Sequence, residues 1–300
     1  MKRMKRKTNS EGTLWTFPFI LASAVLVIVF AATIFAPFIA PWDPNQLDLR
    51  QIFASPSPEH LLGTDKTGRD IFSRILFGGR MTLSGAFAVV AISMILGIPA
   101  GLFAGYYGGK ADKIMMWVTN IIVSFPPLLL AFVFVAVFGS GFEKVVLALG
   151  VIYVPMLART TRSIVLTQRN QTYVEAVEAM GYGTGTILFK HILPNCMPTI
   201  LVQVTLDIGN AILDLAAMSF LGLGVKPPVS DWGAMLEDGR VYLLTQPLQA
   251  LAPGIMIVVT VVAINVFVEE IRKYLNPSER RLPTYRQLVK RGLIAEEAGR

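Results

Sequence analysis

Two carboxylates and an amide interrupt an apolar stretch, LDIGNAILD, at residues 206–214. Asp207 and Asp214 are seven residues apart, about two helical turns, so a helix presents them on one face with Asn210 between them. Carboxylates inside a membrane span are costly and usually face a cavity or a partner. The strip therefore suits an ammonium group or a metal complex, and Ser219 extends it toward the outer mouth. The alternatives are a structural contact with another subunit and a carboxylate near the membrane interface.

A second polar stretch, GTDKTGRD at residues 63–70, has the G-x4-G spacing of a phosphate-binding loop. It continues with Arg69 and Asp70, so it lacks the lysine that contacts the phosphates and the hydroxyl that binds magnesium. No apolar strand precedes it. We therefore interpret its glycines as shaping a loop, with Asp65, Arg69 and Asp70 bonded locally or to a docking protein.

Other reactive side chains are scarce. The chain has one cysteine, Cys196, and two histidines, His60 and His191, so no disulfide can form within it. No His, Cys and carboxylate cluster has metal-site spacing, and no nucleophile is paired with a base. The sequence predicts a protein that is not an enzyme and that holds no metal or cofactor of its own.

The composition is that of an integral membrane protein. Of 300 residues, 53% are hydrophobic and 16% charged, against about 25% charged in soluble domains. The net charge of +7 is spread over both tails and several loops, which excludes a nucleic-acid surface. The basic residues are better explained as setting the orientation in the membrane, so lipid is an expected partner.

Runs of apolar residues long enough to cross the roughly 30 Å hydrocarbon core predict an all-α fold. The first run exceeds the apolar region of a signal peptide and is interpreted as an uncleaved helix. In the third, Asn120, Ser124 and Pro126 predict a kink that lines the path, and Pro155 interrupts the fourth. The six predicted spans are about 17–36, 82–104, 114–138, 142–160, 197–223 and 248–268.

The distribution of Lys and Arg predicts the orientation. With the N-terminus in the cytoplasm, 19 of these residues lie inside and 8 outside, so both termini are expected to be cytoplasmic. The domain organisation follows, with a short interfacial helix expected at 70–77 in the outer loop. Its parts are the tail 1–16, the first helix and outer loop 17–81, a five-helix core 82–271 and the tail 272–300.

The block EAVEAMGYGTGTILFKHILPN, residues 175–195, is too polar to span a membrane. Tyr173, Val177 and Met180 share a helical face, and Gly181 can take the left-handed conformation that ends a helix. A second segment follows at 186–193, before Pro194. This pattern predicts a helix–turn–helix knob that docks into a partner's groove, or else a loop lying on the membrane.

The block resembles the EAA loop of ABC importer permeases, which inserts a coupling helix into the ATPase subunit. Val177 stands where that family usually has alanine. The resemblance implies that the knob couples to an ATPase through seven residues: Glu175, Ala176, Glu178, Gly181, Ile192, Leu193 and Pro194.

Further motifs extend the resemblance over residues 14–277. They are similar to the C-type permease subunit of dipeptide, oligopeptide and nickel importers: HLLGTDKTGRDIFSR (60–74), GLFAGYYGG (101–109), FPPLLLA (125–131), SFLGLGVKPPVSDWGAML (219–236) and YLNP (274–277). This implies a type I ABC importer permease fold of six membrane helices in a bacterial or archaeal inner membrane. It also implies a partner permease, two ATP-binding subunits that hold ATP and magnesium, and an external substrate-binding protein.

The substrate stays open between nickel or another metal chelate and a di- or oligopeptide. TLDIG (205–209), MSFLGLGV (218–225) and TQPLQ (245–249) look closer to nickel-type subunits. The rival classes are a secondary transporter or channel without ATPase partners and an intramembrane enzyme. Neither accounts for the coupling block, and the chain shows no internal repeat of the kind common in secondary transporters.

Overall fold

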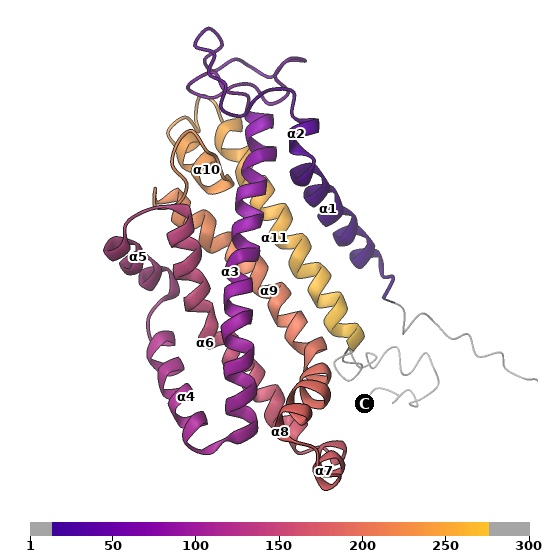
Figure 1. Cartoon of the computed structure of the whole chain (residues 1–300). Helices are drawn as coiled ribbons and strands as arrows, with labels where there is room; N and C mark the ends of the chain where they lie inside the picture. The colour runs from indigo at the N-terminus through magenta and orange to yellow at the C-terminus, as the bar shows by residue number, and fades with distance from the viewer. Residues whose placement is uncertain (1–13, 276–300) are drawn as a thin grey trace, which may run out of the picture.

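The structure, a computed structural model, describes residues 14–275, which form helices joined by loops and contain no β-strand (Figure 1). This confirms the all-α prediction. The helices are α1 (Phe17–Ile34), α2 (Ala36–Ile39), α3 (Ile71–Tyr107), α4 (Gly109–Val123), α5 (Pro127–Phe138), α6 (Phe142–Arg169), α7 (Thr172–Ala179), α8 (Thr184–Thr186), the π-helical turn η1 (Ile187–Ile192), α9 (Leu193–Phe220), α10 (Trp232–Arg240) and α11 (Leu248–Leu275).

Four helical runs among the described residues are long and apolar enough to cross a membrane: α1, α3, the run from Thr184 to Phe220, and α11. The pair α4 and α5 adds a fifth if it forms one span bent by 86°. The fourth predicted span falls on α6, whose second half carries Arg159, Arg162 and Arg169 and which does not meet the same test. The count of six spans therefore stays a prediction.

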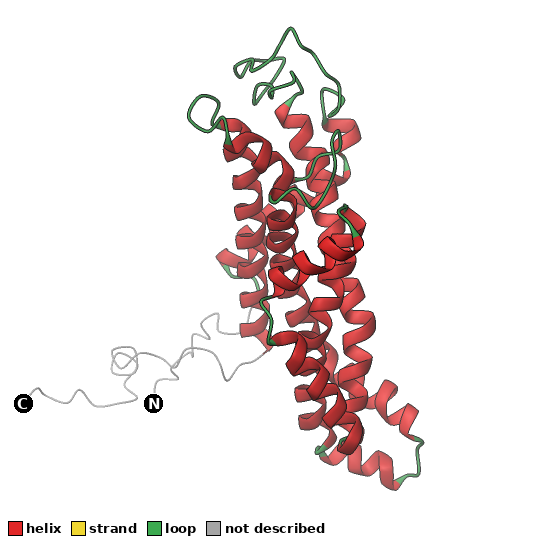
Figure 2. Cartoon of the chain, turned by 90° about the vertical axis from the view of Figure 1, so that its left-hand side faces the viewer, coloured by secondary structure: helices red, strands yellow, loops and turns green. Residues whose placement is uncertain are grey.

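The long helices form an elongated bundle (Figure 2). Its most extensive helix–helix contact lies between α3 and α6, where Gly97, Gly101 and Gly105 follow one another at intervals of four residues. A Cβ atom on Gly101 would lie 2.4 Å from the carbonyl oxygen of Ala158. Small residues at this spacing let two membrane helices approach closely, which strengthens van der Waals contact where no hydrophobic effect drives association.

The prediction of a separate interfacial helix at 70–77 is wrong, because these residues form the N-cap and the first turns of α3. The Asp70 carboxylate caps the helix by accepting a 2.7 Å bond from the Ser73 amide. Gly78 and Gly79 lie inside the helix, where the absence of a side chain allows close packing. A Cβ atom on Gly79 would lie 2.5 Å from Thr33 and 2.8 Å from Trp232.

The two ends of the bundle differ. The loop 40–70 and α10 cover one end, and α7 projects from the other (Figure 1). The first turn of α1 lies beside the end of α11, where the Thr16 hydroxyl donates a 2.6 Å bond to Glu270. Most of the two tails predicted from the sequence, 1–16 and 272–300, lies outside the described residues.

Candidate functional site

A cavity of about 390 Å³ lies halfway along the bundle, between α6, α9 and the break that separates α4 from α5. Three of the residues predicted to line a path, Asp207, Asn210 and Asp214, meet there. The other lining residues are Ile122, Val123, Phe125, Pro127, Ile152, Tyr153, Met156, Gln203 and Leu213. A mostly apolar wall with a few convergent polar groups is typical of a small-molecule site.

Neighbouring side chains orient the two carboxylates. The Tyr153 hydroxyl on α6 donates a 2.7 Å hydrogen bond to Oδ2 of Asp214. The Gln203 amide, one turn before Asp207, donates a 2.8 Å bond to Oδ1 of Asp207. The residue Asp207 is only 3% exposed, and its Oδ2 has no hydrogen-bond partner. Among the residues that the structure describes, Oδ2 therefore has no donor, although Asp207 itself lines the cavity.

The kink predicted in the third span is confirmed. The helix α4 ends at Val123, α5 begins at Pro127, and their axes differ by 86°. Irregular backbone at membrane depth is tolerated where it lines a cavity, and Phe125 of the break lines this one. Asn120 lies outside the lining and accepts a 3.1 Å bond from Arg159.

Ser219 does not join the strip. It lies five residues beyond Asp214, a rotation of about 140° around an α-helix, and its side chain points elsewhere. Its hydroxyl donates a 2.5 Å hydrogen bond to Asp231, the residue that caps α10. The structure thus places Ser219 in the joint between α9 and α10.

At the opposite end from the loop 40–70, α7 forms the first half of the predicted knob. Val174 and Val177 are buried against the bundle, whereas Glu175, Ala176 and Glu178 are exposed. Met180, which was assigned to the apolar face, is 65% exposed. It follows the last helical residue, so its side chain leaves the face that Val174 and Val177 share.

Gly181 ends this helix with φ of +80°, the left-handed conformation expected from the sequence. The second segment is not ended by Pro194, contrary to the prediction, because η1 leads directly into α9. A π-helical turn shifts the hydrogen-bond register and so accommodates the missing proline amide. Ile192 is buried there, and Leu193 and Pro194 open α9.

A contact that the sequence did not indicate joins the knob to the bundle. The Tyr106 hydroxyl at the end of α3 donates a 2.9 Å hydrogen bond to Glu178 on α7. The Arg169 guanidinium lies 5.6 Å from the centre of the Tyr106 ring, within the range of a cation–π contact. Tyr106 and Tyr153 each meet a carboxylate more than 60 residues away in the chain, so no local spacing points to them.

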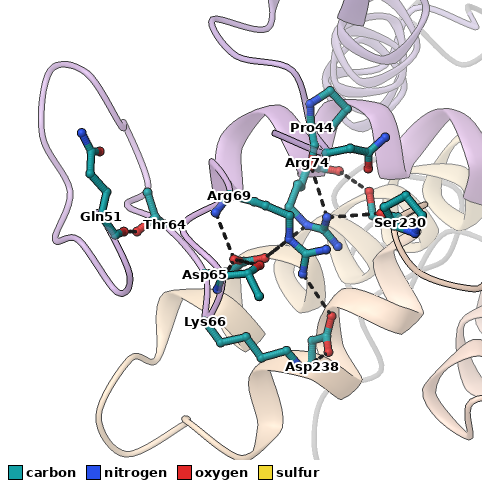
Figure 3. Close-up of polar contacts among 12 residues, drawn as sticks. Pro44, Gln51, Thr64, Asp65, Lys66, Arg69, Arg74, Ser230 and Asp238 are labelled. Carbon is teal, nitrogen blue, oxygen red and sulfur yellow. Dashed lines mark hydrogen bonds and ion pairs between the residues drawn. The ribbon is translucent and has the colours of Figure 1, made fainter. Parts of the chain in front are cut away.

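The third predicted group, Asp65, Arg69 and Asp70, lies at the end of the loop 40–70, and Figure 3 shows Asp65 and Arg69. Arg69 donates a 2.7 Å bond from Nε to Asp65, and Asp70 lies 2.9 Å from His60. All three side chains are buried within the chain. The local bonding foreseen from the sequence is present, and the docking role stays a prediction.

Ion pairs connect this loop to α10. Lys66 lies 2.6 Å from Asp238, and Arg69 lies 3.8 Å from the same carboxylate. Burial alone would raise the pKa of Asp65, but hydrogen bonds from Thr67 and the charge of Arg69 outweigh it and lower that pKa. The bond to Asp238 raises the pKa of Lys66. Both shifts favour the charged forms, so the pairs persist at neutral pH.

Comparison with known proteins assigns the family. Residues 97–281 match the model of the binding-protein-dependent transport system inner membrane component. The chain is 39% identical to the glutathione transport system permease protein GsiD of Pectobacterium atrosepticum, over 86% of each chain. It is 36% identical to the nickel transport system permease protein NikC of Escherichia coli, over 86% of this chain and 93% of that one.

A third relative is the probable D,D-dipeptide transport system permease protein DdpC of Escherichia coli, 38% identical over 92% of this chain and 94% of that one. The fold is similar to that of an inward-facing structure of the MetNI methionine ABC transporter, with a TM-score of 0.54 and 19% identity over 67% of this chain and 96% of that one. The expected type I importer fold is thereby supported. The chain belongs to the family of binding-protein-dependent transport system inner membrane components, the permease subunits of ABC importers.

Proposed function

We propose that this chain and a partner permease together form the membrane path of an ABC importer for small peptides or metal complexes. The observation that carries this proposal is the continuous helical run from Thr184 to Phe220. One end of the run belongs to the exposed knob around α7, and its middle carries Asp207 and Asp214 in the cavity. A movement imposed on the knob would reach the cavity through a single rigid element.

In this proposal the energy comes from two separate ATP-binding subunits, which hold ATP and magnesium. Their closure pulls on the knobs of the two permeases and turns the path from one side of the membrane to the other, a rigid-body switch. From Leu193 to Asp207 the helix rises about 21 Å at 1.5 Å per residue. This distance separates the site of ATPase coupling from the site of substrate passage.

The exposed face of α7 is the proposed ATPase contact. Glu175 and Ala176 face solvent while Val174 and Val177 hold the helix on the bundle. A short helix with a fixed base and a free polar face suits a groove in a partner. The excess of Lys and Arg supports a cytoplasmic position for this end and for both termini. The external binding protein then docks on the loop 40–70 and α10.

The substrate is proposed from the relatives and from the cavity. The relatives carry glutathione, dipeptides and nickel in their names. The cavity carries two carboxylates and no basic lining residue. Small peptides with a free amino terminus fit this arrangement, and the second candidate, nickel in complex, shares the positive charge.

Two measurements test the function. The tagged chain, solubilised in mild detergent, is expected to retain a second permease and an ATP-binding protein. Cells that lack the chain, but keep its partners, are expected to lose uptake of labelled dipeptide, glutathione or nickel. Uptake of all three at the parental rate, together with the absence of an ATP-binding protein from the purified complex, would overturn the proposal.

A further inference from the structure

We propose that the mid-bundle cavity is a cation-binding site, in which Asp207 and Asp214 receive the positively charged group of the substrate in turn. This inference rests on the proposed function and deepens it. It names the chemistry that the path selects: a primary ammonium group or a cationic metal complex. It also gives the two carboxylates different roles, which their spacing in the sequence does not distinguish.

The first observation is that one carboxylate oxygen of Asp207 has no hydrogen-bond partner among the described residues. Oδ1 is occupied by Gln203 at 2.8 Å, whereas Oδ2 has no partner although it is fully buried. A buried carboxylate oxygen without a donor is costly, and an N–H donor that carries a positive charge removes most of that cost. Asp207 lines the cavity, so a donor there would reach Oδ2 once the carboxylate turns toward it.

The second observation concerns Asp214, whose carboxylate already has a donor. The Tyr153 hydroxyl holds its Oδ2 at 2.7 Å, so this carboxylate is fixed in orientation and already has a neutral donor. Seven residues of α-helix separate the two Cα atoms by about 10 Å along the axis, with Asn210 between them on the cavity wall. A single ammonium group cannot contact both carboxylates at that spacing. They therefore form two successive positions.

The remaining charges and ligands limit what can bind. Within the part of the chain that the structure describes, no other charged side chain lines the cavity, and Arg159, one turn beyond Met156, is bonded to Asn120. Among residues 14–275 no three His, Cys, Asp or Glu side chains gather closely enough to hold a metal ion. The cavity thus suits a single positive charge or a metal that arrives with its own ligands, and it lacks the donor set to strip and hold a bare ion.

Thiol chemistry measures the electrostatics of the cavity without requiring transport. The natural thiol of Cys196 is fully buried and is replaced by alanine, and Asn210→Cys then places one reactive thiol on the cavity wall. In the assembled complex this thiol is treated with methanethiosulfonate ethylammonium or with methanethiosulfonate ethylsulfonate. We expect the cationic reagent to react about tenfold faster, relative to the ratio for a free thiol, because one nearby charge contributes on this scale.

The Asp207→Asn change in the same background is expected to reduce this preference severalfold, because Asp214 remains on the cavity wall. Glu143→Gln, at an exposed position at the start of α6, is the matched control and should leave it unchanged. A variant that fails to assemble is recognised by size-exclusion chromatography, and Gln203→Leu then replaces it. That change releases Oδ1 and should strengthen the preference. Equal rates for the two reagents in the parent background would overturn the proposal.

Substrate protection distinguishes the sources of the cation. A labelled dipeptide, the same dipeptide acetylated at its amino terminus, and nickel are each supplied with the external binding protein and ATP. Protection of the Asn210→Cys thiol by the free dipeptide alone assigns the site to an amino terminus, and protection by nickel alone assigns it to a metal complex. Protection by the acetylated dipeptide to the same extent, or by none of the three, would overturn the cation site. The reagent preference remains measurable even if uptake and ATPase binding, and with them the proposed function, fail.

Discussion

The hydroxyl of Tyr106 and the carboxylate of Glu178 lie 2.9 Å apart, and this hydrogen bond joins the last turn of α3 to α7. The Arg169 guanidinium covers the Tyr106 ring from the end of α6. The last turns of α3 and α6 thereby meet α7 at the base of the knob. The position of α7 is fixed by this contact in addition to its buried valines, which is what a helix needs if it is to transmit force from a partner.

Tyr106→Phe removes the hydrogen bond and retains the ring and its contact with Arg169. The expected result is a transport rate reduced about threefold to tenfold, with ATP hydrolysis that responds less to the loaded binding protein, since an exposed hydrogen bond contributes about 0.5–1.5 kcal/mol. Reconstituted complexes would show this as a higher ratio of ATP hydrolysed to substrate moved. Tyr107→Phe is the matched control, because Tyr107 is exposed and makes only ring contacts. A ratio unchanged in the Tyr106 variant would remove this contact from the coupling route.

Gly181→Val tests the turn of the knob. A Cβ atom at this position meets nothing within 4 Å, but φ is +80°, so the cost is backbone strain of about 1–2 kcal/mol or more for a β-branched residue. The turn is expected to rearrange, and uptake should fall severalfold while the protein still reaches the membrane. Uptake is compared with membrane abundance measured by immunoblot.

Gly183→Val is the control for that change. Its Cβ atom also meets nothing within 4 Å, and its φ of −67° and ψ of 150° suit valine. The structure therefore predicts near-normal uptake. If the two variants lose uptake equally, side-chain bulk on the docking surface, and not the left-handed turn, is what matters.

The knob and the polar strip could be predicted because their signals are local. Glycine at a helix end and a repeat of apolar residues specify the turn at Gly181, and a spacing of seven placed Asp207 and Asp214 on one face. The break near Pro126 was predicted for the same reason, since proline removes an amide and constrains the residue before it. In each case the relevant physics acts within two helical turns.

The features that were not predicted from the sequence depend on contacts between residues that lie far apart in the chain. Residues 70–77 were predicted as a separate interfacial helix, yet they open α3, which packs at Gly79 against Thr33 and Trp232. The placement of Ser219 follows from Asp231 on a different element. Tertiary contacts of this kind override local preference, and a single sequence does not display them.

The contact between α3 and α6 leads to a stability prediction. Gly101→Ala would place a methyl group 2.4 Å from the Ala158 carbonyl oxygen and 2.7 Å from Thr161. Both neighbours are fixed on α6, so the helices must separate, at a cost of about 1–3 kcal/mol for overpacking. The melting temperature of the purified protein in detergent is expected to fall by several degrees.

Gly209→Ala provides the comparison, since its nearest neighbour outside its own helix would be 3.5 Å away, an ordinary contact. This change should leave the melting temperature unchanged or raise it slightly, because alanine is the better helix former by about 1 kcal/mol. A similar loss in both variants would mean that glycine is required at these positions for a reason other than close approach.

The ion pairs of the loop 40–70 predict a pH dependence that Asp65 determines. Its pKa in the folded protein lies below the usual 3.8. The carboxylate therefore stabilises the fold at pH values above its unfolded pKa, and this contribution is lost as the pH falls through the folded value.

Asp65→Asn leaves Arg69 and Arg74 without their shared anion, and breaking a buried pair of this kind costs about 3 kcal/mol. Melting curves from pH 8 to pH 3 should show a constant difference between the parent and this variant down to about pH 4, and a shrinking difference below it. Glu59→Gln, at an exposed position of the same loop, should follow the parent throughout. A difference for Asp65→Asn that grows as the pH falls below 5 would show that the pKa of Asp65 is raised in the folded state.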